Sequence, residues 1–239
     1  MDNRFYFETK NKTDKNVKIV GQEYNHLVKV RRASVGENIV GFNGDGNDYF
    51  LKINEITKSY VDCSILNVST NPSVVNNNIT IYLASIKGDA LDEALDGLTQ
   101  LNIKEIVIFT SQYTNVKYSE EKLEKIKAHL IQSCKQCERA DIPVVRLIKF
   151  DKMIEELSSY DLNIFAYENA KENFNNLEIV KNKKISIIIG GEGGFNNSEV
   201  ESLDKLCCRV SLGKTILRAK LAVVALTSAV LAKLGEFSR

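Results

Sequence analysis

Residues 185–195 decide the fold of this chain, and they read Ile-Ser-Ile-Ile-Ile-Gly-Gly-Glu-Gly-Gly-Phe. The uncharged, β-branched run at the start predicts a buried strand of the kind found in parallel sheets. The four glycines after it permit positive φ and let a ligand approach peptide groups closely. Asn196 or Asn197 can cap the helix that follows. A plain turn between strand and helix needs only one or two glycines, so we expect this loop to contact a ligand.

Strand-like and helical segments alternate on both sides of this loop. The predicted strands are 79–85, 105–110, 144–148, 163–167, 185–189 and 209–212. The clearest helices are 119–140, which Ser119 can cap, and 217–234, which is apolar nearly all round and ends at Gly235. This alternation predicts an α/β domain over residues 71–239, with a mostly parallel sheet covered on both faces.

Residues 1–70 show mainly short strand-like runs, and this pattern predicts a small β-barrel domain. The expected strands are 4–7, 38–43, 49–56 and 60–68, with a hairpin turn at 43–48 and a helical interruption at 24–32. The polar stretch 69–78 contains one of the two prolines of the chain and is the best candidate for a linker.

Composition limits the function classes. Lys and Arg number 32 against 31 Asp and Glu, so any nucleic-acid contact must come from a local patch. The first residues lack a signal-peptide pattern, and the uncharged run 221–232 is far shorter than the roughly 20 residues that span a bilayer. The five cysteines are irregularly placed, and Cys134-x-x-Cys137 has no second pair at a suitable spacing. We expect a cytoplasmic protein with reduced thiols, no membrane segment and no metal site.

A second loop, 212–218, joins the last predicted strand to the last helix and reads Leu-Gly-Lys-Thr-Ile-Leu-Arg. Both loops follow strands, so they are expected to share a pocket at the carboxyl edge of the sheet. Two nucleotide motifs are excluded. The dinucleotide pattern would need a glycine at Asn196, and a phosphate loop ending at 213–215 would need one at Cys208.

The two loops, in this order and this close to the C-terminus, resemble the signature of RsmE methyltransferases of the SPOUT superfamily. Supporting motifs are 25–32 followed by Gly36, and the set Cys134, Gln136, Cys137, Arg139 and Pro143. The resemblance implies a PUA-like RNA-binding barrel at 1–70 and a SPOUT methyltransferase domain with a C-terminal trefoil knot at 71–239. It implies a homodimer that uses S-adenosyl-L-methionine to methylate N3 of a uridine in 16S ribosomal RNA. The substrate would be small-subunit ribosomal RNA or the assembled small subunit.

The resemblance also suggests roles for individual residues. Arg218 is the expected catalytic residue, because a fixed guanidinium can stabilise the anion left when uridine N3 loses its proton; an ion pair at a helix start is the alternative. The residues expected around the cofactor are Tyr167, Ile189, Gly190, Gly191, Glu192, Gly193, Leu212, Gly213, Ile216 and Leu217. Those expected to contact RNA are His26, Lys29, Arg31, Arg32 and Arg139. The lysine and arginines near 29–32 could equally form a solvated helix end.

The chain departs from the family pattern near the expected site. Lys220 replaces an acid, Gly191 replaces a proline, and Gln112-Tyr113 replaces a glutamate and an arginine. The segment around Gly97, Gln100 and Asn102 lacks the lysine, glutamate and glycine that the family has at the end of the corresponding helix. These departures leave three alternatives: a divergent enzyme, an enzyme with another target base, or an RNA-binding ribosome-assembly protein that has lost catalysis.

Overall fold

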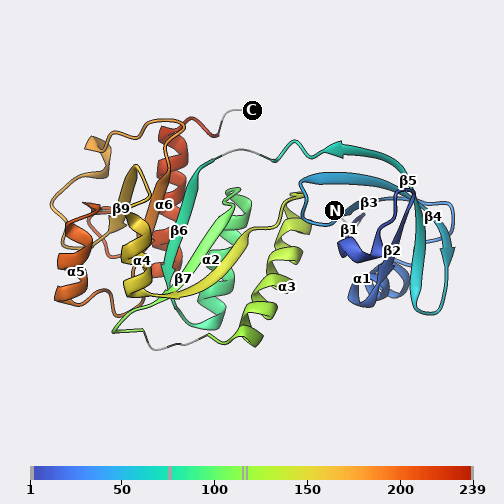
Figure 1. The fold of residues 1–239 in the computed structure, drawn as a ribbon, viewed down its shortest axis with the longest axis horizontal. Coiled ribbons are helices and arrows are strands. Elements are labelled where there is room, and N and C mark those ends of the chain that lie inside the picture. The colour runs from blue at the N-terminus through green and yellow to red at the C-terminus, as the bar shows by residue number, and fades with distance from the viewer. Residues whose placement is uncertain (1–2, 75–76, 115, 117, 238–239) are drawn as a thin grey trace. The chain divides into compact units, whose positions relative to one another are not determined.

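The computed structural model describes residues 3–74, 77–114, 116 and 118–237. The chain divides into two compact units (Figure 1). The first comprises Met1–Val75 and Ile131–Ile142, and the second comprises Asn76–Leu130 and Pro143–Arg239. The predicted division at residue 70 assigned 131–142 to the second domain, whereas this segment packs with the first unit. Residues 75 and 76 of the predicted linker lie outside the described residues.

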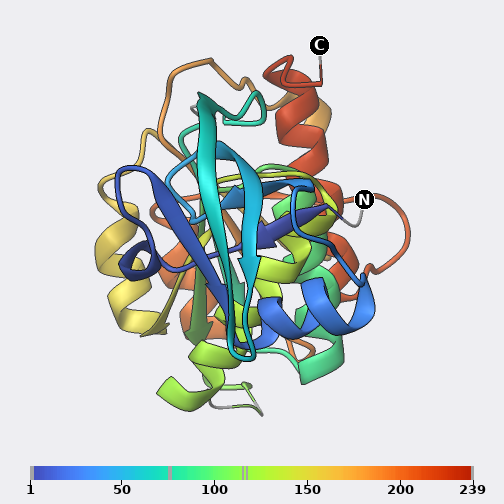
Figure 2. The same ribbon diagram turned by 90° about the vertical axis from the view of Figure 1, so that its right-hand side faces the viewer.

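The first unit is built on a five-stranded sheet in the order β1-β3-β4-β5-β2. The strands are β1 (Arg4–Tyr6), β2 (Asn16–Val20), β3 (Asn38–Phe42), β4 (Asn47–Ile56) and β5 (Tyr60–Thr70). Two register irregularities between β4 and β5 bend the sheet, and Figure 2 shows this unit face on. The predicted helical interruption is a short helix, α1 (Gly21–Asn25), that continues as a π-helical turn, His26–Val30. The curled sheet agrees with the predicted PUA-like barrel.

The segment 131–142 completes this unit. Phe42 of β3 packs against Cys134 and Ala140 in a small buried cluster. Glu23, which is 8% exposed, accepts hydrogen bonds from the Lys135 ammonium at 2.8 and 2.9 Å. Asn71 is also buried, and its amide donates to Asp48 and to the carbonyl of residue 138, so the start of the predicted linker is fixed.

The second unit contains a six-stranded sheet in the order β11-β9-β10-β6-β7-β8, and all its pairings are parallel. The strands are β6 (Ile79–Ala84), β7 (Glu105–Thr110), β8 (Val144–Lys149), β9 (Leu162–Ala166), β10 (Ile185–Ile189) and β11 (Cys208–Val210). The predicted α/β fold with a parallel sheet is therefore confirmed. Strand order does not define how the chain is threaded, so the trefoil knot stays a prediction.

Helices cover both faces of this sheet (Figure 1). On one face, α4 (Phe150–Leu157) and α5 (Asn197–Asp204) bury apolar residues against β6, β7, β9 and β10. On the other face, α2 (Gly88–Gln100) and α6 (Ala219–Lys233) contact each other, and α6 contacts β10. The helix α3 (Glu120–Gln136) ends earlier than the predicted 140, because Glu138 adopts φ 62°. Among the described helices, none is long and apolar enough to span a membrane.

A polar network joins the strands to α4. Arg146 of β8 donates to both carboxylate oxygens of Glu156 at 2.9 and 2.7 Å and to Glu105 at 2.8 Å. The Tyr82 hydroxyl donates to the same Glu156 carboxylate at 2.9 Å. The Arg146 hydrogen bonds hold the pKa of Glu156 below its ordinary value of 4.5, with burial opposing them and Tyr82 assisting.

The lowered pKa of Glu156 predicts acid sensitivity. A carboxyl with a lowered folded-state pKa stabilises the fold above its unfolded pKa, and this contribution is lost as pH falls through the folded value. We expect the melting temperature of the wild type to fall more steeply below about pH 4.5 than that of Glu156→Gln. Glu155→Gln, which removes an exposed carboxylate from the same helix, should keep the wild-type slope. Equal slopes for Glu156→Gln and wild type would contradict the prediction.

Gly97 lets α2 and α6 approach closely. A Cβ at this position would lie 2.6 Å from Cγ2 of Val224, a stiff side chain on α6. The departure from the family pattern at Gly97 is thus a packing feature.

We expect Gly97→Ala to lower the free energy of unfolding by about 1 kcal/mol, because overpacking exceeds the gain in helix propensity. In a Val224→Ala background the same substitution should raise it by about 1 kcal/mol. Urea unfolding of the four proteins measures both effects. A stabilising Gly97→Ala in the wild-type background would show that this contact is not tight.

Candidate functional site

A cavity of about 130 Å³ lies at the carboxyl ends of β9, β10 and β11. Its walls come from the end of β9, from the glycine loop 190–195, from the loop 211–217 and from the start of α6. The lining residues are Ala166, Tyr167, Glu168, Ile189, Gly190, Gly191, Gly194, Phe195, Ser211, Leu212, Gly213, Lys214, Thr215, Ile216, Leu217, Ala219 and Ala222. The two loops that the sequence placed at one strand edge therefore share one pocket.

All the residues predicted to surround the cofactor line this cavity except Glu192 and Gly193. Those two are exposed on the outer side of the glycine loop. A Cβ at Gly193 would lie 3.0 Å from Cβ of Tyr113 and 3.4 Å from its carbonyl oxygen. The glycine loop thus has an inner side that faces the cavity and an outer side on which Tyr113 packs.

The glycine loop is held at its far end by the start of α5. Asn196 caps the helix by accepting from the Glu199 backbone N–H, and the Glu199 carboxylate accepts from the Asn196 backbone N–H at 3.0 Å. Phe195, at the end of the loop, stacks on Phe109 of β7, with ring centroids 6.2 Å apart and ring planes 4° apart. Gly194 adopts φ 66° and its N–H donates to the carbonyl of Gly191 at 3.1 Å. The loop backbone is therefore preorganised.

The second loop lines the cavity and has peptide N–H groups that are available to a ligand. In the described part of the chain, no backbone N–H of residues 212–217 donates to another protein group. Gly213 adopts φ 121°, a conformation that side chains oppose. Ile216 is 82% exposed although it lines the cavity. Peptide donors beside apolar side chains suit a ligand with a flat ring and polar edges.

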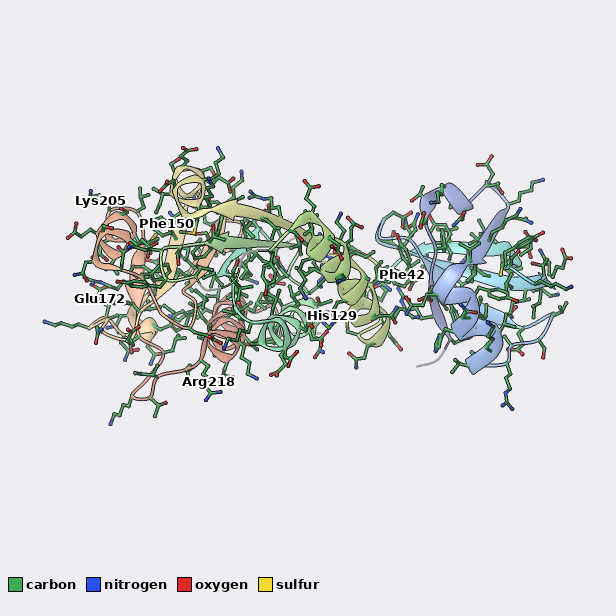
Figure 3. All side chains as sticks on the ribbon, turned by 90° about the horizontal axis from the view of Figure 1, so that it is seen from below. Phe42, His129, Phe150, Glu172, Lys205 and Arg218 are labelled. Atoms are coloured by element: carbon green, nitrogen blue, oxygen red, sulfur yellow. The ribbon has the colours of Figure 1, made fainter. Side chains whose placement is uncertain are left out.

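Arg218 follows this loop and is the N-cap residue of α6 (Figure 3). Its side chain is exposed and has no ion-pair or hydrogen-bond partner among the residues that the structure describes. It does not line the cavity itself, although its neighbours Leu217 and Ala219 do. The guanidinium is available to a molecule that approaches the rim of the cavity.

Sequence reasoning missed several lining residues. Glu168 and Ala166 flank the predicted Tyr167, while Gly194 and Phe195 belong to the glycine loop itself. The others missed are Ser211, Lys214, Thr215, Ala219 and Ala222. Gly194, Phe195, Lys214 and Thr215 lie within the two quoted segments, so taking each segment whole would have found these four. The other five flank the segments or Tyr167, or lie on the first turn of α6.

The residues expected to contact RNA lie in the first unit and differ in their surroundings. Lys29 is exposed, and the half-buried His26 ring lies 5.6 Å from the Phe5 ring. Arg31 pairs with Glu37 at 2.8 Å, and the backbone of Arg32 has φ 56°.

Arg139 does not fit the predicted RNA contact. It is 1% exposed, and its guanidinium donates to both carboxylate oxygens of Asp141 at 3.0 and 2.9 Å. A guanidinium that is almost completely buried and paired with a carboxylate is not accessible to a phosphate or base. The structure gives Arg139 a role inside the first unit.

Two other departures from the family pattern, Lys220 and Gln112, also have local structural partners. Lys220 pairs with Glu93 of α2 at 2.6 Å and does not line the cavity. The Gln112 side chain accepts a hydrogen bond from the Asn196 amide, and its backbone N–H donates to Glu199 at 2.9 Å. Gln112 thereby ties the loop after β7 to the start of α5.

Burial governs the ionisation of two of the cysteine thiols. Burial raises the pKa of the Cys134 and Cys207 thiols to about 12, which keeps both thiols protonated. Within the described ranges, no three His, Cys, Asp or Glu residues are grouped so that they could hold a metal ion.

Comparison with known proteins defines the class. Residues 74–231 match the model of an RNA methyltransferase domain, and residues 19–66 match that of an RNA methyltransferase PUA domain. Because the first match covers more than half of the chain, the chain belongs to this family of RNA methyltransferases.

Matches to individual proteins point to one group within this family. The ribosomal RNA small subunit methyltransferase E of Rickettsia conorii is 28% identical over 229 residues, which cover 93% of this chain and 92% of that protein. The protein of the same name from Bacillus subtilis is 26% identical over 229 residues, covering 89% and 88%. The predicted resemblance to the RsmE group is confirmed.

A solved structure shows the same fold. The crystal structure of a ribosomal RNA small subunit methyltransferase E from Neisseria gonorrhoeae, bound to S-adenosyl methionine, superposes with a TM-score of 0.86. It is 23% identical, and the match covers 96% of this chain and 97% of that one.

Proposed function

We propose that this protein transfers a methyl group from S-adenosyl-L-methionine to N3 of a uridine in 16S ribosomal RNA. The observation that carries the proposal is the cavity at the carboxyl edge of the sheet, which two glycine-containing loops enclose and beside which the unpartnered Arg218 stands. The names of the relatives support a small-subunit ribosomal RNA target. The choice of N3 rests on the RsmE resemblance and on the chemistry of Arg218.

The residues of the cavity fit S-adenosyl-L-methionine. Ile189, Leu212 and Leu217 offer apolar surface to the adenine ring, and the free backbone N–H groups of 212–217 can pair with its polar edge. Gly190, Gly191 and Gly213 keep side chains out of the space that the cofactor would fill. Glu168 supplies a carboxylate to a ligand that carries positive charge. When bound, the cofactor supplies an electrophilic methyl group.

Arg218 serves the acceptor base. Uridine N3 must lose its proton before it can attack a methyl group, and the resulting anion spreads over N3 and the neighbouring oxygens. A guanidinium that is free of other partners can donate two hydrogen bonds to this anion and lower the barrier. Placing Arg218 on a helix start fixes its backbone beside the cavity.

We further propose that the enzyme works in the cytoplasm as a homodimer. Ile216 and Leu221 support this assembly, because they are 82% and 53% exposed beside the cavity and would be covered by a second copy. Lys29, Arg31, Arg32 and His26 are the proposed RNA contacts of the first unit; Arg139 is no longer among them. The substrate is small-subunit ribosomal RNA, naked or within the subunit.

The alternative of a non-catalytic RNA-binding protein receives little support. It was motivated by the departures at Gly97, Gln112, Tyr113 and Lys220. None of these side chains lines the cavity. Each has a packing or hydrogen-bonding partner elsewhere. The departure at Gly191 does line the cavity, and because glycine has no side chain it leaves space for the cofactor there.

The proposal is tested by incubating the protein with labelled S-adenosyl-L-methionine and small ribosomal subunits that lack the modification. We expect N3-methyluridine in the digested RNA by mass spectrometry. Arg218→Ala should lower the rate about 100-fold while cofactor affinity stays unchanged, because the guanidinium acts on the developing anion. Lys205→Ala, which removes an exposed charge from the end of α5, should retain the wild-type rate. Detection of a different methylated nucleoside would show that the enzyme modifies another base. The absence of any methylated product would refute the proposed activity.

The cofactor assignment makes a separate prediction about Gly213. Its φ of 121° is strained for any other residue, so Gly213→Ala should displace the 212–217 loop and weaken S-adenosyl-L-methionine binding about tenfold. Gly88→Ala is the matched control, because that glycine has open space around it and no positive φ. Calorimetric titration measures the affinity of both variants for S-adenosyl-L-methionine. Unchanged affinity of Gly213→Ala would remove this loop from the cofactor site.

A further inference from the structure

A second cavity lies at the same edge of the sheet. It has a volume of about 380 Å³ and lies at the ends of β7 and β8 and the starts of α4 and α5. Its lining includes Gln112, Lys149, Phe150, Asn196, Ser198 and Ser202. The proposed methyl transfer uses none of these residues.

The lining has the chemistry of a site for a neutral, flat, polar-edged ligand. Lys149 has no ion-pair partner among the described residues, and Asp151 balances its charge within the same wall. The Glu199 carboxylate is already engaged, because its two oxygens accept the backbone N–H groups of Gln112 and Asn196. The cavity therefore has no surplus of positive charge, which argues against a phosphate as its main ligand.

The hydrogen-bonding groups favour a nucleobase. The amides of Gln112 and Asn196 bond to each other, and this leaves the Gln112 NH₂ and one N–H of Asn196 free to pair. The Lys149 ammonium adds a donor on the same wall. The hydroxyls of Ser198 and Ser202 already donate to Asn196 Oδ1 and to the Ser198 carbonyl, so they offer acceptor lone pairs there. Donors and acceptors of this kind read the edges of unstacked bases in single-stranded RNA.

An exposed aromatic ring adjoins the loops that line the two cavities. Tyr113 follows Gln112 directly, is 49% exposed and packs on the outer side of the glycine loop at Gly193. Figure 3 shows Phe150 on the α4 side of the sheet and Arg218 on the α6 side. The exposed Tyr113 ring is a stacking surface for a base of an RNA that reaches both sides.

We propose that the second cavity binds a nucleobase of the substrate RNA that flanks the target uridine, and that Tyr113 stacks on a base between the two sites. This inference rests on the proposed function. It assigns to Gln112-Tyr113, where the chain departs from its family, a role in choosing the RNA sequence around the methylated position.

The test measures the affinity of the full-length protein for a short fluorescein-labelled, uridine-rich single-stranded RNA, and KM and kcat for small subunits. We expect Tyr113→Ala and the double variant Gln112→Ala/Lys149→Ala each to weaken RNA affinity and raise KM about tenfold. Affinity for S-adenosyl-L-methionine should stay within about twofold of wild type, because neither variant touches the first cavity. Tyr113→Phe should restore RNA binding, since stacking needs the ring and not the hydroxyl.

Lys152→Ala is the matched control for the loss of a lysine beside this cavity. Lys152 pairs with Glu155 and does not line the cavity, so this variant should bind RNA as the wild type does. Wild-type RNA affinity and KM in both the Tyr113→Ala and the double variant, in a protein that methylates RNA, would overturn this inference alone. A wild-type protein that neither binds nor methylates RNA would overturn the proposed function and this inference with it.

Discussion

The burial of β10 on both faces is the constraint on which the second unit depends. Every residue from Ile185 to Ile189 is buried, because strands pair with β10 on both sides and helices cover both faces of the sheet. Such a strand can expose functional groups only where it ends. The four glycines at that end make a ligand site possible, since they leave backbone groups accessible where side chains would otherwise fill the space.

The same edge of the sheet is organised by a single carboxylate. Glu199 is 7% exposed and ties together the start of α5, the end of the glycine loop and the loop after β7. Its position on the first turn of α5 also places it favourably in the field of the helix. One residue therefore holds both the end of the glycine loop and the loop that carries Tyr113, although these two segments are distant in the sequence.

Local patterns predicted the buried parts of the fold well and the long-range pairings poorly. The strands 105–110 and 185–189 were predicted with their observed bounds, because short runs rich in isoleucine and valine are typical of strands buried inside a sheet. The strand β2 was missed, since it is only five residues long, buries only Val17 and Ile19, and pairs with β5, which lies far along the chain. Arg139 was predicted to contact RNA because of the motif in which it stands. In the structure it forms a buried ion pair with Asp141, two residues further along the chain. The contact of Tyr113 with Gly193 joins two loops that no periodicity connects.

The discontinuity of the first unit affects the order of events during synthesis. Phe42 belongs to an early strand, but its buried neighbours Cys134 and Ala140 are made much later. A chain emerging from the ribosome therefore carries an unfinished barrel with an uncovered apolar patch while most of the following segment is translated. Domains generally fold as units during synthesis. Here the N-terminal unit can be completed only once residue 142 has emerged. Its folding therefore overlaps in time with that of the second unit, whose residues 76–130 have already been made.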